Sequence, residues 1–277
     1  MTFTRSLYKP LLDSQRRDGV EVTRDRAYGA DPRHRLDVYR PLAASAKPLP
    51  VLVFLHGGGF IRGDKSDREN MGQYFARQGM VVIVPNYRLA PAHTWPAGAQ
   101  DAAAAYDWAR VNAAGVGGDP NRIFLAGESA GAAHLAAATL IRRFLPADGR
   151  AIAGVALISG VYDVRLEWMA RGQFGIPTPD PRNDAYFGTD FNRYAEMSTV
   201  ELIDAQPIPM LITYAELDML QMQVQAGELF ARLTTRHGFS PRLCVIRGHN
   251  HLTQVYSVNT GDESLSGPLL EFFRSSC

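Results

Sequence analysis

The chain has 277 residues, a length that a single α/β domain can reach. Hydrophobic residues make up 46% of it and charged residues 21%, as in soluble proteins that bury a continuous core. Its 29 basic and 28 acidic residues are spread along the chain, which argues against a nucleic-acid or membrane-binding surface. We therefore expect one domain over residues 1–277 whose partner is a small, largely neutral molecule.

The N-terminal 20 residues contain no apolar core of a secretory signal, which would span about 7 to 15 residues. The chain also has no run of about 18 apolar residues that could cross a bilayer, so a cytoplasmic protein without membrane association is expected. Polar and apolar residues alternate over residues 20–40, most clearly at 34–39. This alternation predicts an antiparallel pair of strands at a sheet edge.

From about residue 50 onward, short apolar runs alternate with longer helix-patterned segments. This order predicts a mostly parallel sheet with helices on both faces, because parallel strands need crossover connections. Strands are predicted at 51–55, 81–86, 123–126, 154–158, 210–214 and 243–246, and helices at 66–78, 97–112, 130–144, 219–237 and 266–274. The strand at 243–246 is expected to bury Cys244. Because Cys277 is the only other cysteine, no disulfide framework is expected.

The segment 160–206 interrupts this alternation. It is rich in aromatic residues and in prolines, which stand at Pro177, Pro179 and Pro181, with Pro207 and Pro209 just beyond. It shows no strand periodicity, so we interpret it as an insertion of loops and short helices that covers a pocket as a small cap. An ordinary packed excursion without a role in binding is the alternative.

A serine lies in a glycine-rich turn at residues 127–131, Gly-Glu-Ser-Ala-Gly. The turn follows a predicted strand and precedes a predicted helix, which is the context of a nucleophile elbow. Such a turn needs small residues because it lifts the serine hydroxyl above the sheet and crowds its own backbone. Ser129 is therefore the candidate nucleophile, at the N-terminus of a helix whose dipole stabilises an oxyanion.

A second glycine cluster, His-Gly-Gly-Gly-Phe at residues 56–60, follows the predicted strand 51–55. Backbone amides in such a loop can stabilise the negative charge of a tetrahedral intermediate. We assign these oxyanion donors to Gly58, Gly59 and Ala130. A phosphate loop is the competing interpretation, but no Gly-Lys-Ser/Thr sequence or GxGxxG spacing occurs here. His56 is expected to brace the loop.

A serine hydroxyl needs a base to take its proton and an acid to orient that base. Glu216 and Asp218 follow the predicted strand 210–214, and His249 and His251 follow the strand 243–246. We choose Asp218 over Glu216 because it lies further beyond the strand end, just before a helix. His251 is preferred over His249. No HExxH, CxxC or comparable ligand spacing is present, so neither a metal nor another cofactor is expected.

Together these motifs resemble the hormone-sensitive-lipase-like family of carboxylesterases and acylhydrolases within the α/β-hydrolases. The resembling stretches are 56–60, 87–91 with Pro96, Ala97 and Asp101, 127–131, 216–218 and His251. The resemblance implies an eight-stranded, mostly parallel sheet, a cap, and a catalytic triad of Ser129, Asp218 and His251. It implies hydrolysis of short-to-medium acyl esters without a cofactor, and by analogy a homodimer.

The aromatic residues suit an aryl ester. Substrate contacts are expected at Phe60, Glu128, Trp95, Tyr162 and Phe187. An amidase or arylformamidase with the same triad is the alternative enzyme, and the residues do not separate the two. A small-molecule receptor of the same fold is the alternative outside enzymes, but such receptors have lost a catalytic residue, whereas every candidate residue is present here.

Overall fold

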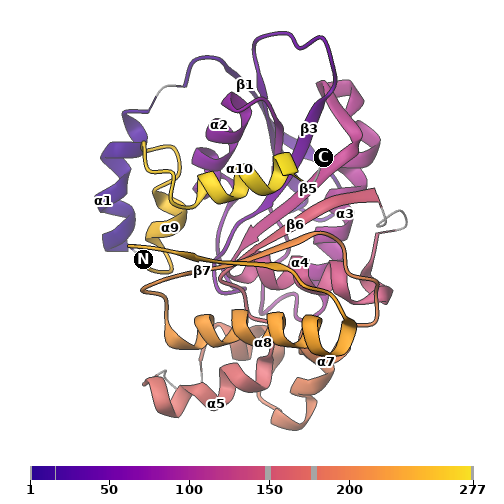
Figure 1. Cartoon of the computed structure of the whole chain (residues 1–277), viewed down its shortest axis with the longest axis vertical. Helices are drawn as coiled ribbons and strands as arrows, with labels where there is room; N and C mark the ends of the chain where they lie inside the picture. Colours follow the sequence, from indigo (N-terminus) through magenta and orange to yellow (C-terminus); the bar gives the residue numbers. More distant parts are fainter. Residues whose placement is uncertain (1, 16, 147–150, 176–179, 276–277) are drawn as a thin grey trace.

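The computed structural model describes residues 2–15, 17–146, 151–175 and 180–275. Its centre is an eight-stranded sheet in the order β1-β2-β4-β3-β5-β6-β7-β8 (Figure 1). The strands are β1 Val20–Ala27, β2 Arg35–Pro41, β3 Leu49–Leu55, β4 Val81–Pro85, β5 Gly118–Glu128, β6 Ile152–Ile158, β7 Met210–Ala215 and β8 Arg242–Ile246. The pairs β1–β2 and β2–β4 are antiparallel and the others are parallel. The predicted α/β-hydrolase fold is confirmed.

Helices cover both faces of the sheet (Figure 1). They are α1 Thr2–Asp13, α2 Glu69–Arg77, α3 Ala97–Asn112, α4 Ala130–Leu140, α5 Val164–Phe174, α6 Asn183–Phe187, α7 Thr199–Leu202, α8 Leu220–His237, α9 Thr253–Tyr256 and α10 Ser266–Ser275. One core packs α3, α4 and α8 against the sheet, and a second packs α2 and α10 against the opposite face. Successive side chains of a strand point to opposite faces of the sheet and so pack into the two cores in turn. This is why β3 is apolar throughout.

The segment 160–206 folds as α5, α6, a 3-10 helix at Phe191–Met197 and α7, and no strand occurs in its described residues. Pro177 and Pro179 lie outside the described residues, as does Cys277. The helices α5 and α7 contact α8, and they lie together at the bottom of Figure 1. Among the described residues, no helix is long and apolar enough to cross a membrane.

The structure differs from the expectations at the N-terminus and at the last strand. The helix α1 was not predicted, and it lies against α9 at the side of the sheet. The expected burial of the strand 243–246 is wrong, because β8 is the edge strand and pairs only with β7. Leu243 and Val245 are 41% and 40% exposed, and Cys244 is half-buried. An apolar run by itself does not distinguish an edge strand from a central one.

Candidate active site

Ser129 occupies the sharp turn between β5 and α4. Its φ of +51° is rare for a residue with a side chain, and such strain is held only where the surrounding structure enforces it. A Cβ on Gly127 would lie 2.8 Å from the backbone of Gly131, and one on Gly131 would lie 2.5 Å from the carbonyl oxygen of Leu55. Both approaches are too close for a methyl group. The two glycines therefore allow the turn that presents the serine.

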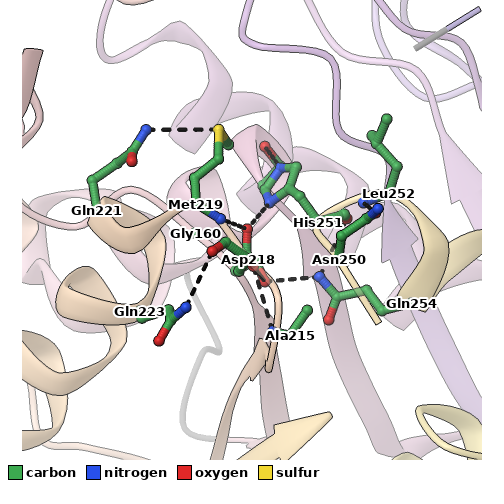
Figure 2. A network of polar contacts seen from close by, with 12 residues as sticks. Gly160, Ala215, Asp218, Met219, Gln221, Gln223, Asn250, His251, Leu252 and Gln254 are labelled. Carbon is green, nitrogen blue, oxygen red and sulfur yellow. Dashed lines mark hydrogen bonds and ion pairs between the residues drawn. The ribbon is translucent and has the colours of Figure 1, made fainter. Parts of the chain in front are cut away.

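His251 lies between Ser129 and Asp218. Its Nε2 is 3.1 Å from the Ser129 hydroxyl oxygen, and its Nδ1 is 2.9 Å from Oδ1 of Asp218. Asp218 comes from the loop after β7 and His251 from the loop after β8, so three strand ends supply the three groups. Figure 2 shows the His251 ring directed at the Asp218 carboxylate. This arrangement can remove the proton of a serine hydroxyl.

The Asp218 carboxylate is held from several sides. Oδ2 accepts from the Ser159 hydroxyl at 2.5 Å. Oδ1 accepts from the Met219 amide at 2.9 Å, a contact that Figure 2 shows. Burial alone would raise the pKa of Asp218, but its hydrogen bond to His251 and the other donors lower it. Burial alone would lower the pKa of His251, but the Asp218 hydrogen bond and charge raise it above 6.5. The carboxylate thus favours a proton on the imidazole.

The two alternative residues lie elsewhere in the network. Glu216 accepts from the Gly248 amide at 2.8 Å and thereby ties the two loops together. His249 contacts Asp262 at 3.0 Å and Thr253 at 3.1 Å. The structure therefore brings Asp218 and His251 to the serine, and uses Glu216 and His249 to hold the loops.

The glycine loop after β3 faces the nucleophile. Gly58 and Gly59 have φ values of +147° and +60°, and a Cβ on Gly58 would lie 1.9 Å from the carbonyl oxygen of Arg62. Within the described part of the chain, no group accepts a hydrogen bond from the amides of Gly58, Gly59 or Ala130. Three amides without an internal acceptor beside a serine hydroxyl are what an oxyanion site needs.

A buried ion pair supports this loop. The Glu128 carboxylate accepts from the Gly57 amide at 2.9 Å and from the Arg68 guanidinium. His56 is fully buried, its Nδ1 lies 2.7 Å from the Gly57 carbonyl oxygen, and burial lowers its pKa to about 4. His56 is therefore neutral and braces the loop.

A pocket of about 80 Å³ opens beside Ser129 and His251. Phe60 and Glu128, two of the five predicted substrate contacts, line it, although the Glu128 carboxylate is already engaged by Arg68 and Gly57. Met219 and Met222 contribute apolar side chains to the wall of the pocket. The described residues contain no group of three or more His, Cys, Asp or Glu side chains placed to hold a metal ion.

The structure places the other three predicted contacts away from this lining. The Tyr162 side chain is 1% exposed, and its hydroxyl accepts from the Gly160 amide, so the ring belongs to the core. Trp95 packs against Phe144, with ring centroids 5.5 Å apart. The ring of Phe187 packs edge-on against that of Phe60, with centroids 5.1 Å apart. Aromatic content indicated a pocket wall but not which rings reach it.

The lining also includes residues that sequence reasoning missed, namely Arg62, Glu167, Arg182 and Asn183. Glu167 belongs to α5, Asn183 to α6, and Arg182 directly precedes α6. No short motif marks them. For Glu167, Arg182 and Asn183 the signal was that polar residues occur inside a segment expected to cover the pocket. For Arg62 it was the position shortly after the glycine loop 56–60.

The sheet order, the strand-turn-helix serine and the three loops define an α/β-hydrolase. Residues 52–254 match the sequence profile of a family described as having the alpha/beta hydrolase fold. This match covers most of the chain, and the protein belongs to that family. The family resemblance inferred from the motifs is confirmed.

Individual relatives match over shorter stretches. Esterase LipC of Mycobacterium tuberculosis is 42% identical over 111 residues, which are 40% of this chain and 27% of that protein. A probable isoprenylcysteine alpha-carbonyl methylesterase of Arabidopsis thaliana is 37% identical over 128 residues, or 46% of this chain and 26% of that protein. The match thus spans about a quarter of the length of these relatives.

The solved structure of esterase B from Lactobacillus rhamnosis superposes with a TM-score of 0.82 and covers 99% of this chain and 93% of that one. Its sequence identity is 20%, so this likeness concerns the fold.

Proposed function

We propose that the protein is a serine carboxylesterase that hydrolyses short-to-medium acyl esters, including aryl esters, through an acyl-enzyme. The observation that carries this proposal is the hydrogen-bonded series Ser129, His251 and Asp218 beside three amides without an internal acceptor. Two relatives with similar sequences, an esterase and a probable methylesterase, are consistent with it.

In the first half-reaction, the Ser129 Oγ attacks the ester carbonyl carbon while Nε2 of His251 takes the hydroxyl proton. Asp218 keeps the imidazole oriented, because it accepts a hydrogen bond from Nδ1 and stabilises the imidazolium that forms. The carbonyl oxygen becomes an oxyanion and is stabilised by the amides of Gly58, Gly59 and Ala130. The alcohol then leaves with the proton of His251, and an acyl-serine remains.

In the second half-reaction, water attacks the acyl-serine. His251 takes a proton from this water, and the intermediate collapses to release the carboxylic acid and to return the proton to Ser129. The three amides stabilise the second oxyanion as they did the first. No other group is required for the chemistry.

The size of the pocket limits the length of the acyl group. Its volume of about 80 Å³ is well below the roughly 300 to 1,000 Å³ typical of sites for drug-sized ligands. Phe60 and Met222 provide apolar contact for a short alkyl chain. Short acyl groups are therefore favoured over long ones.

The test is steady-state hydrolysis of aryl esters from acetyl to dodecanoyl, with one aryl formamide, by the wild type and by Ser129→Ala. We expect turnover of acetyl and butyryl esters that declines with chain length and is abolished in Ser129→Ala. Folding of the variant is checked by its circular dichroism and melting temperature. Substantial turnover by folded Ser129→Ala would contradict the role of Ser129, and formamide cleavage without ester cleavage would favour the amidase alternative.

A further inference from the structure

The pocket beside Ser129 has a polar wall on the side of the segment 160–206. Glu167 and Asn183 both line it, and they are 2% and 6% exposed. Buried carboxylates and amides are normally fully hydrogen-bonded, because an unpartnered polar group away from water is unfavourable. The hydrogen-bond partners of these two side chains therefore show whether any polar atom of the wall lacks a partner within the protein.

One carboxylate oxygen of this wall has no hydrogen-bond partner among the described residues. Oε1 of Glu167 accepts from Nδ2 of Asn183 at 2.9 Å, and the same Nδ2 also donates to Asp180 at 3.2 Å. Oε2 of Glu167 is buried and has no hydrogen-bond partner among the described residues. Asn183 Nδ2 has two protons and both are used, so it cannot serve Oε2 as well.

The nearby cations are paired with other carboxylates. Arg182 donates from two nitrogens to the two oxygens of Asp180, at 3.0 and 2.9 Å. Arg171, one helical turn beyond Glu167, pairs with Asp184, although its Nε has no partner among the described residues. Burial and the charge of Asp180 raise the pKa of Glu167 more than Asn183 and the two arginines lower it. The environment therefore does not neutralise Glu167 by an ion pair.

We propose that Oε2 of Glu167 hydrogen-bonds a hydroxyl group of the ester substrate, so that the enzyme prefers esters carrying a neutral hydroxyl in the acyl or alcohol part. This inference rests on the proposed esterase function and specifies its substrate class. A hydroxyl can donate to a carboxylate and can also accept from a protonated carboxyl group, so it suits Glu167 in either state.

An anionic substituent fits this wall less well. Arg182 lines the same pocket but is paired with Asp180, so it offers no free positive charge to such a group. An anionic substituent would face the carboxyl of Glu167 and the charge of Asp180 behind it. A neutral hydrogen-bonding group avoids both repulsions.

The test compares two matched pairs of esters. Para-nitrophenyl β-hydroxybutyrate against para-nitrophenyl butyrate places the hydroxyl in the acyl part, and hydroxyethyl butyrate against propyl butyrate places it in the alcohol. Each kcat/KM is divided by the rate of alkaline hydrolysis to remove intrinsic reactivity. We expect the wild type to prefer the hydroxylated member of one pair by roughly tenfold, the size expected for a hydrogen bond to a charged group.

Glu167→Gln keeps the shape of the side chain but replaces the Oε2 acceptor by an uncharged amide donor, so the preference should fall well below the wild-type value, to that of a neutral hydrogen bond. The control is Glu196→Gln, which makes the same change at a 66% exposed side chain of the same segment and should keep the wild-type preference. A preference that persists unchanged in Glu167→Gln would overturn the proposal.

Absence of any preference in the wild type would also overturn it and would mean that Oε2 stays buried without a substrate contact. This wild-type result decides the matter even if Glu167→Gln fails to fold. Failure of the proposed function is distinct, because then no ester of either pair would be hydrolysed in a Ser129-dependent way.

Discussion

Removing one partner of the buried ion pair between Arg68 and Glu128 is predicted to destabilise the protein strongly. Both side chains are 5% exposed, so neither charge is compensated by water. Arg68→Met keeps the apolar stem but leaves the Glu128 carboxylate buried with only the Gly57 amide as a donor. Removing one partner of a buried pair costs about 3–5 kcal/mol. For a chain of 277 residues this loss lowers the melting temperature by roughly 5–9 °C.

The measurement is a double-mutant cycle by urea denaturation. Glu128→Gln retains an acceptor for the Gly57 amide but leaves the Arg68 guanidinium unpaired. The double variant Arg68→Met/Glu128→Gln removes both charges, so its loss of unfolding free energy should be smaller than the sum of the two single losses. A loss below about 1 kcal/mol for Arg68→Met, or strict additivity in the cycle, would refute the reasoning.

The matched control is Arg193→Met. Arg193 faces Glu196 at 3.6 Å, and both side chains are 66% exposed. Exposed pairs are screened by water, so this variant should change the unfolding free energy by less than about 0.5 kcal/mol. An equal loss in both variants would show that burial does not decide the effect.

Further predictions concern the triad. The pKa of His251 is raised above 6.5, and the imidazole must be unprotonated to act as a base. We therefore expect kcat/KM to fall as the pH decreases through a midpoint above 6.5. A pH-rate profile with its midpoint at or below 6.5 would contradict the contact between His251 and Asp218. Asp218→Asn should lower kcat by about 10⁴ and move this midpoint to lower pH, because the anion that stabilises the imidazolium is gone; an unshifted midpoint would argue against Asp218. Ser159→Ala should lower kcat/KM roughly tenfold, because it removes a hydrogen bond to the charged Asp218. Burst kinetics would show whether acylation or deacylation is slowed. Wild-type rates in this variant would show that Ser159 is dispensable.

Features that depend on residues a few positions apart could be predicted from the amino-acid sequence alone. The turn at Ser129 requires Gly127 and Gly131, because any Cβ there meets backbone within 3 Å, and this requirement is visible as a short motif. The apolar strands and the helix periods likewise follow from residues a few positions apart. The sheet and its alternating helices were therefore predictable, together with the position of the nucleophile and of the glycine loop.

The rest depends on which distant segments meet, and only the tertiary structure decided it. His251 and Ser129 are brought together across the sheet, whereas His249, two residues away, turns to Asp262. The same holds for the pocket wall: aromatic composition indicated Tyr162, but folding buries that ring and places Glu167 at the pocket. Which side chain reaches a pocket depends on the packing of neighbouring helices, and a linear sequence records that packing only indirectly. By itself the sequence determined the fold and the local chemistry, and the long-range packing determined the partners of each group.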